Sequence, residues 1–506
     1  MTGSRTKRST INIVVNIFNR IVSLLLPFAL RTVMIQKLGV EYLGLNGLFS
    51  SLLSMLSLSE LGFSSAVIFA MYKPMAEGNN EEVIALLNFY KKIYRTVALV
   101  ISALGLIALP FLDHFIASDY PRDINIYAVY IIYLVNTVLS YGLFAYKNSI
   151  LVASMRSDLD STVTTLSQAV MYALQIIVLI VARDYYIYAL CMPLGTVLTN
   201  IAKLYIVDKK YPQYKGVGKL SKEKKRDIIT RVGALIGNKI GGVVFSSVDS
   251  IVISSFLGLA VLGKYSNYFL IYNSVVGIQI LIFSSMQAVI GNSLVCRSEE
   301  ENSKTFYEMF LINNWITICG SCCFIGLYQP FMKMWVGEEN MLPFIIPALL
   351  TFYYFVRGIR RVCYAFKEAA GMWREDWLKP YVSVVVNLIV NIILVKLIGL
   401  SGIVISSIAA LMLVEIPWEV HIFFKLYFKK SEFGYYLQIF KFSLVALVAT
   451  VGSYFACMYI PENIIGFVLR IVICIIIPNI LFFAVYFRTE EFNSAKDRVL
   501  RLIKRK

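Results

Sequence analysis

The amino-acid sequence predicts an all-α, polytopic membrane protein with about fourteen transmembrane helices. Of the 506 residues, 58% are hydrophobic and only 16% are charged, whereas a typical soluble domain is about half apolar and a quarter charged. The mean hydropathy is +0.70, and apolar runs long enough to cross a ~30 Å hydrocarbon core recur along the chain. An open chain in lipid satisfies its backbone hydrogen bonds only as helices, so each run is expected to be α-helical.

The apolar runs give the expected spans in chain order. They cover residues 11–35, 42–72, 93–116, 124–150, 160–182, 185–207, 230–257, 264–292, 306–332, 341–366, 377–398, 402–426, 437–459 and 464–487. We expect two pseudo-symmetric six-helix lobes followed by two C-terminal helices. The expected divisions are an N-lobe at 1–207, a basic cytoplasmic linker at 208–229, a C-lobe at 230–426, and the last two helices with a basic cytoplasmic tail at 427–506.

The positions of the basic residues predict the orientation of the chain. If both termini are cytoplasmic, most of the 48 Lys and Arg residues fall on the cytoplasmic side, as the positive-inside rule requires. The net charge of +17 is therefore attributed to topology and to contact with anionic lipids. No nucleic-acid-reading motif accompanies the charge, so nucleic acid is not an expected partner.

Two parts of the chain resemble each other when they are shifted by 219 positions. The matching pairs are Leu38-Gly39 with Leu257-Gly258, Leu43-Gly44 with Leu262-Gly263, and Asn19-Arg20-Ile21 with Asn238-Lys239-Ile240. A repeat of this size, with a cation at the same place in the first helix of each half, is typical of a transporter whose substrate site lies between the halves.

Ionisable residues inside the expected spans are the main candidates for function, because each costs at least ~2.5–3.5 kcal/mol to insert into a bilayer. Arg20 and Asn16 share one face of the first span, and Arg31 lies about 20° from Arg20 on the helical wheel. Lys239 and Asp249 lie in the span at 230–257. Two simpler interpretations stay open: Arg31 snorkels to the outer headgroups, and Asp249 pairs with another helix.

Further charged candidates lie in three other spans. Glu60 lies among serines in the second span and is a candidate cavity acid or charge partner. Arg357 and Arg360, with Arg361, end the tenth span near the cytoplasm, where they can meet an anionic substrate or serve only as topology signals. Three polar residues near the inner end of the twelfth span allow a proton relay or simple interfacial solvation, namely Glu415, Glu419 and His421.

No sequence signature of an enzyme, a metal site or a cofactor site is present. The two histidines, His114 and His421, lie in different spans, and no Walker A run of the form GxxxxGK[ST] occurs. Cys319 and Cys322 have CxxC spacing, but small residues one turn apart inside a span are more typical of close helix packing. Transport driven by a gradient is therefore expected, rather than catalysis or ATP hydrolysis.

Three phrases carry a resemblance to a known family. They are LGVEYLGLNGLFSSLLSMLSLSELG at 38–62, VDSIVISSFLGLAVLGKYSNY at 248–268 and YAFKEAAGMWREDWLKPYVSVVVNLIVNIILVKLIGLSGIVISS at 364–407. The sequence resembles the bacterial polysaccharide flippases of the Wzx type, in the superfamily of the multidrug and toxin extrusion proteins and the lipid II flippase. The resemblance implies two six-helix lobes around a central cavity in the bacterial cytoplasmic (inner) membrane.

The resemblance also implies a substrate. It implies export of an oligosaccharide linked to undecaprenyl (polyprenyl) pyrophosphate, with Arg20 and Lys239 as cavity cations, and a polysaccharide polymerase and glycosyltransferases as possible partners. Fixed cations can substitute for the water that a pyrophosphate loses. We expect alternating access, with possible H⁺ or Na⁺ coupling through Asp249 or Glu60. Two alternatives remain: a multidrug exporter of the same fold, and a non-transporting scaffold of a polysaccharide assembly complex.

Overall fold

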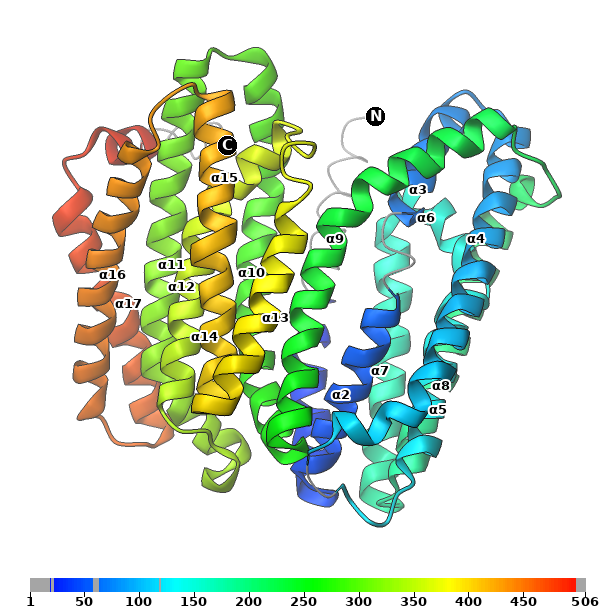
Figure 1. Ribbon diagram of the computed structural model, residues 1–506, viewed down its shortest axis with the longest axis horizontal. Helices are drawn as coiled ribbons and strands as arrows, with labels where there is room; N and C mark the ends of the chain where they lie inside the picture. The colour runs from blue at the N-terminus through cyan, green and yellow to red at the C-terminus, as the bar shows by residue number, and fades with distance from the viewer. Residues whose placement is uncertain (1–18, 20–21, 58–62, 118–119, 497–506) are drawn as a thin grey trace. The chain divides into compact units, whose positions relative to one another are not determined.

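The computed structural model describes residues 19, 22–57, 63–117 and 120–496, without the side chains of 157, 231–242, 245–246, 281–282 and 284–289. The described residues form helices and connecting segments, with no strand among them (Figure 1). Within this part, eight helices are long and apolar enough to cross a membrane, and the bent pair α5–α6 makes a ninth if it counts as one span. The prediction of an all-α polytopic membrane protein is confirmed.

The chain divides into two compact units, Met1–Gly263 and Lys264–Lys506. In the N-terminal unit a helical segment at 22–37 comes first. The following elements are α2 (Val40–Leu56), α3 (Phe63–Ala76), α4 (Asn80–Ala108), η2 (Leu109–Phe115), α5 (Ile126–Gly142), η3 (Ala145–Lys147), α6 (Asn148–Ala153), α7 (Ser157–Val181), α8 (Tyr185–Lys210), η4 (Pro212–Tyr214) and α9 (Lys222–Leu257).

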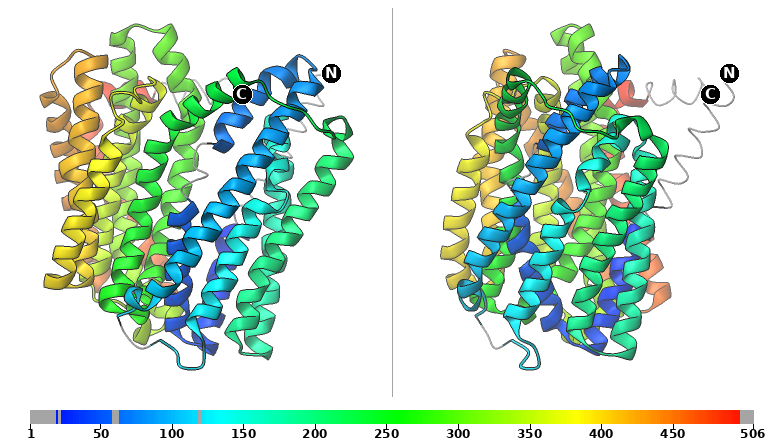
Figure 2. Two further views of the ribbon diagram at one scale, coloured as in Figure 1. Left: turned by 45° about the vertical axis from the view of Figure 1, so that its right-hand side comes forward. Right: turned by 90° about the vertical axis from the view of Figure 1, so that its right-hand side faces the viewer.

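The C-terminal unit contains the remaining helices, which run side by side in the views of Figure 2. They are α10 (Leu259–Cys296), which begins just before the boundary, α11 (Glu299–Val336), η5 (Glu338–Asn340), α12 (Ile345–Ala369), α13 (Lys379–Ile398), α14 (Leu400–Ala410), η6 (Leu411–Glu415), α15 (Ile416–Ile422), η7 (Phe423–Tyr427), α16 (Phe433–Met458) and α17 (Ile464–Tyr486). Helix α11 packs against α12, α16 and α17.

Two expected spans are interrupted in the structure. The expected span at 42–72 consists of two helices, α2 and α3, and residues 58–62 between them lie outside the described residues. The expected span at 124–150 is bent by 42° where α5 meets η3 and α6. Phe144 has a left-handed backbone there, with φ of 57°, which a helix does not tolerate in its interior.

The internal repeat is visible as matching backbone geometry within the N-terminal unit. Gly39 precedes α2 with φ of 117°, and Gly258 precedes α10 with φ of 88°. The amide of Gly39 donates to the carbonyl of Met34 at 3.2 Å, and the amide of Gly258 donates to that of Ile253 at 3.1 Å. Only glycine adopts such positive φ values without strain, so the repeated Leu-Gly pairs mark equivalent helix ends.

A second pair of repeated glycines lies where the two repeats contact each other. A Cβ atom on Gly44 would lie 2.0 Å from the carbonyl oxygen of Leu259, and one on Gly263 would lie 2.2 Å from that of Val40. Val40 and Leu259 are themselves related by the shift of 219 positions. The contact is therefore reciprocal: each repeat presents a glycine to the first residue of the other repeat's helix.

Candidate functional site

The N-terminal unit contains a polar cavity of about 420 Å³. The segment at 22–37 and helices α2, α5, α7 and α8 contribute its lining, which includes Arg31, Asn46, Gln168, Gln175 and Asn200. Hydroxyl groups of threonine, serine and tyrosine side chains fill much of the remaining polar wall. No Asp or Glu is among the lining residues, so arginine is the cavity's ionic group.

Hydrogen bonds hold the cavity wall in place. The side-chain amide of Asn46 donates to the hydroxyl of Tyr188 at 3.2 Å, and Thr196 donates to the side-chain oxygen of Asn136 at 2.7 Å. Gln175 is 1% exposed, and its Nε2 donates to the carbonyl of Tyr188 at 3.4 Å. Its Oε1 has no hydrogen-bond partner among the described residues. In the described part of the chain, the wall thus offers fixed amide and hydroxyl groups around Arg31.

The structure brings together only some of the residues that the sequence predicted for the site. Arg31 lines the cavity, and Asp249 is buried on α9. Asn16, Arg20 and Glu60 lie outside the described residues. Lys239 belongs to α9, but its side chain is not among those described. The predicted roles of these residues in substrate binding and coupling stay predictions.

Arg357 and Arg360, the other two predicted ligands, lie on α12 in the C-terminal unit. Arg360 is engaged by two acids of the α14–η7 segment. Its Nε donates to Glu419 Oε2 at 2.7 Å and its Nη2 to Glu419 Oε1 at 2.6 Å, while its Nη1 forms an ion pair with Glu415. This bidentate geometry is the strongest arrangement between a guanidinium and a carboxylate.

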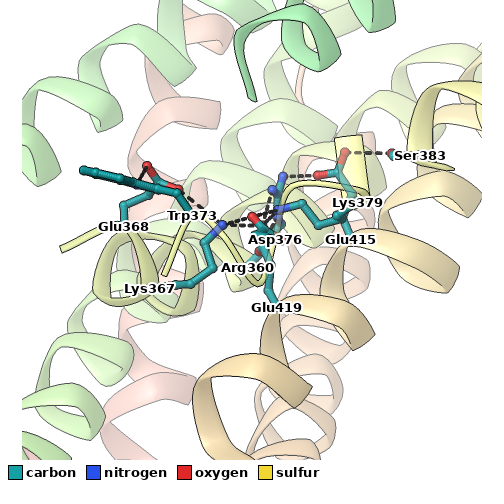
Figure 3. A network of polar contacts seen from close by, with 9 residues as sticks. All are labelled: Arg360, Lys367, Glu368, Trp373, Asp376, Lys379, Ser383, Glu415 and Glu419. Carbon is teal, nitrogen blue, oxygen red and sulfur yellow. Dashed lines mark hydrogen bonds and ion pairs between the residues drawn. The ribbon is translucent and has the colours of Figure 1, made fainter. Parts of the chain in front are cut away.

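The same acids belong to a larger charge network at one end of the C-terminal unit (Figure 3). Lys379 binds both Asp376, at 2.8 Å, and Glu419. Lys367 forms an ion pair with Asp376 and lies 4.0 Å from Glu419. The side chains of Lys367, Asp376 and Glu419 are 0% exposed. The charge network is defined as Arg360, Lys367, Glu368, Asp376, Lys379, Glu415 and Glu419, three cations and four acids, because Glu368 also lies 3.2 Å from Lys367.

The ion pairs within the charge network explain how it tolerates burial. Removing a charge from water costs several kcal/mol, and this cost is recovered only when partners and further hydrogen bonds surround it. Ser383 supplies one such bond, donating to Glu415 at 2.8 Å. The ring of Tyr364 supplies another contact, with Arg360 Cζ and Lys367 Nζ each 5.1 Å from its centroid. A favourable electrostatic interaction between a cation and an aromatic face is expected at such distances.

Local structure brings the acids of the charge network to this position. Glu415 ends the π-helical stretch η6, and Glu419 lies in the following helix α15. A π-helical turn inserts an extra residue and changes the direction of the side chains that follow, and it is frequent at functional sites. Asp376 comes from the segment between α12 and α13, whose turn contains Gly371 at φ of +70°.

Sequence reasoning missed four of the seven residues of this network, one of which is Glu368. Lys367, Asp376 and Lys379 lie at or beyond the expected ends of spans, where charged residues are ordinarily solvated. One feature of the sequence could have predicted the network: basic residues end the tenth span, and acids lie near the end of the twelfth. Within the described residues, no group of three or more His, Cys, Asp or Glu is placed to hold a metal ion.

Comparison with protein families identifies the chain. The family described as "Polysaccharide biosynthesis protein" matches residues 7–290, which is more than half of the 506 residues. The chain belongs to this family. A search of curated proteins found no match.

Solved structures of transporters are similar to this member of the polysaccharide biosynthesis protein family. The lipid II flippase MurJ in an inward closed conformation matches with a TM-score of 0.67 at 15% identity, covering 94% of this chain and 99% of MurJ. An inward-facing multidrug resistance MATE transporter of the MOP superfamily matches with a TM-score of 0.60 at 16% identity, covering 78% of this chain and 93% of that one. The chain therefore has the fold of this transporter superfamily.

A third neighbour is informative about pocket charge within this fold. A MOP-superfamily transporter from Pyrococcus furiosus matches with a TM-score of 0.53 at 14% identity, covering 83% of this chain and 96% of that one. Reversed polarity of its binding pocket is described as suggesting a different function for that protein. The named neighbours are transporters or flippases. The description of the third neighbour indicates that pocket charge can differ between proteins of this fold.

Proposed function

We propose that this protein is a flippase that moves an undecaprenyl-pyrophosphate-linked oligosaccharide from the cytoplasmic to the outer leaflet for cell-surface polysaccharide synthesis. The observation that carries the proposal is the cavity of the N-terminal unit. It combines Arg31 with amide and hydroxyl side chains and has no carboxylate among its lining residues. An arginine complements a phosphate, and amides and hydroxyls complement sugar hydroxyl groups.

The sign of the cavity charge favours a flippase over an exporter of organic cations. A pocket for a lipophilic cation needs acids or aromatic faces, whereas an arginine repels such a ligand. At an effective dielectric constant of ~20, two unit charges 4 Å apart interact by ~4 kcal/mol, so the preference for an anion is large. A non-transporting scaffold has no requirement for a polar cavity inside a membrane unit, and the cavity therefore favours transport.

The proposal includes the direction of transport, its driving force and the location of the protein. The head group enters from the cytoplasm, alternating access releases it on the outer side, and the lipid tail stays in the bilayer. A proton or sodium gradient, acting through Asp249 or Glu60, supplies the driving force. The protein lies in the bacterial cytoplasmic membrane with both termini cytoplasmic, near the glycosyltransferases and polymerase that make and consume its substrate.

The test is an accessibility assay in oriented vesicles. An impermeant sugar-oxidising reagent is applied to vesicles that contain a carrier-linked glycan, with and without this protein. We expect the outward-exposed fraction of the glycan to rise with the wild-type chain and with the exposed-loop control Arg374→Met, but much less with Arg31→Met. Unchanged glycan exposure, together with increased sensitivity to cationic dyes when the gene is deleted, would favour multidrug export instead.

A further inference from the structure

The three arginines of α12 span about 100° of the circumference of that helix, with Arg360 at one edge, Arg361 at the other and Arg357 between them. At 100° per residue, Arg357 and Arg361 lie about 40° apart on the helical wheel, and Arg360 lies about 60° from the first and about 100° from the second. Arg360 meets Glu415 and Glu419 on its face. The other two arginines are thus separated from the acids of the charge network by the geometry of the helix itself.

Arg357 and Arg361 contact aromatic rings instead of carboxylates. Arg357 Cζ lies 5.9 Å from the ring centroid of Tyr353 on α12, and Arg361 Cζ lies 6.0 Å from that of Phe283 on α10. Among the described residues, neither has an acid within ion-pair distance. Moreover, Arg361 Nε is buried and has no hydrogen-bond partner in the described part of the chain.

An unmatched, half-buried pair of guanidinium groups requires a counter-charge. Leaving a buried donor unsatisfied costs about 1–3 kcal/mol, and more when the group is charged. Contact with an aromatic face stabilises the cation. The ring does not accept the hydrogen bonds that the guanidinium N–H groups donate in their own plane. The pair therefore keeps the part of its hydrogen-bonding capacity that recognises oxyanions.

We propose that Arg357 and Arg361 form a binding site for the diphosphate group of the lipid-linked substrate, in addition to the cavity that contains Arg31. This inference rests on the proposed function and assigns residues to one chemical group of that substrate. Residues four apart on a helix have Cβ atoms about 5–6 Å from each other. Because arginine side chains are long, guanidinium groups from such neighbouring positions can converge on two adjacent phosphoryl groups, and each phosphoryl group can receive two parallel hydrogen bonds from one guanidinium.

The charge network acts as a positioning device for this site. Glu419 binds Arg360 through both carboxylate oxygens, and Arg360 in turn fixes the rotation of α12 about its own axis. With Arg360 held toward the acids, Arg357 is turned from them by about 60° and Arg361 by about 100°. The acids of the charge network bind Arg360, Lys367 and Lys379, and among the described residues none forms an ion pair with Arg357 or Arg361.

The experiment measures binding of geranylgeranyl pyrophosphate and geranylgeranyl monophosphate to the full chain in nanodiscs of neutral lipid. We expect the wild type to bind the diphosphate at least about tenfold more tightly than the monophosphate. Arg357→Ala and Arg361→Ala should each weaken diphosphate binding about tenfold and remove most of that preference. Arg361→Lys should keep part of the affinity, because it keeps the charge but loses the bidentate geometry.

The controls separate this inference from the proposed function. Arg374→Ala removes an exposed arginine of the α12–α13 segment and should leave both affinities unchanged. If the wild type binds the diphosphate lipid and the Arg357→Ala/Arg361→Ala double variant binds it equally well, the arginine pair is not the site, although the proposed function stands. If the wild type shows no binding, both proposals fall. Equal wild-type affinity for monophosphate and diphosphate would also overturn the two-arginine site.

Unfolding curves accompany each binding measurement so that a misfolded variant is recognised. The Lys variants at 357 and 361 keep the charge and length needed for packing, and they provide the comparison if an Ala variant unfolds. Full diphosphate preference in a folded Arg357→Lys/Arg361→Lys double variant would show that guanidinium geometry is not used, and would overturn the proposed bidentate recognition.

Discussion

Arg31 and Arg360 are both arginines within membrane helices, but the described surroundings of Arg31 are neutral and those of Arg360 are acidic. Arg31 lines a cavity whose polar wall consists of amides and hydroxyls, with no acid among the lining residues. Arg360 binds Glu415 and Glu419, in a network of three cations and four acids. The comparison shows that the presence of a charge inside a span does not itself indicate a substrate site. Its partners decide whether the charge serves stability or remains available to a ligand.

The largest expected effect is a loss of stability when the charge network loses an acid. The carboxylate of Glu419 is 0% exposed and binds both Arg360 and Lys379. Glu419→Ala removes it. We expect a fall of about 3–5 kcal/mol in the free energy of unfolding, the usual cost of breaking a buried ion pair from one side. Denaturant unfolding in detergent measures it, with the exposed Glu375→Ala as control. Equal stability of the two variants would show that the charge network is not stabilising.

In the cavity, the loss of a charged side chain is expected to impair transport rather than stability. Arg31→Met should lower the rate of glycan export at least about tenfold, which corresponds to about 1.4 kcal/mol, because the phosphate loses its counter-charge. Its free energy of unfolding should change far less than that of Glu419→Ala. Arg31→Lys should keep much of the export. A variant that lost stability and export in parallel would place Arg31 in the same class as Arg360.

A smaller effect is expected from Ser383, which contributes one neutral donor to the charge network. Ser383→Ala removes its 2.8 Å hydrogen bond to Glu415, while the ion pair of Glu415 with Arg360 remains. We expect a loss of about 1 kcal/mol in the free energy of unfolding, measured as for Glu419→Ala. A loss as large as that of Glu419→Ala would mean that the hydroxyl, rather than the charge balance, organises this region.

The smallest effect is expected where an ion pair is exposed to water. Glu338 in η5 lies 2.5 Å from Lys333, and this neighbour holds the pKa of Glu338 below its ordinary value of 4.5. A lowered pKa stabilises the fold above pH 4.5, and the contribution disappears as the pH falls through the lowered pKa. Glu338→Gln should therefore melt almost with the wild type at pH 7, and any difference should vanish on acidification. A difference that grows below pH 4 would contradict this sign.

The sequence predicted the helical membrane fold and the repeat because both depend on local requirements. Apolar runs must be helical in lipid, and Gly39 and Gly258 are required by positive φ values that other residues avoid. The sequence could not predict the charge network, because Asp376 reaches Lys367 and Lys379 only after a turn of the segment between α12 and α13. Likewise, only the packing of α15 against α12 shows that Glu419 neutralises Arg360 and leaves Arg361 on another face.

The reciprocal contact between the two repeats has a consequence for substitutions in the chain. Gly44 faces Leu259 and Gly263 faces Val40, so residue i of one copy meets residue j of the other, and j meets i. This is the pattern of an isologous interface between two identical subunits related by a two-fold axis. A side chain added at either glycine meets a backbone carbonyl at the equivalent place in the other repeat. Each position therefore needs its own glycine, and neither glycine can compensate for the loss of the other.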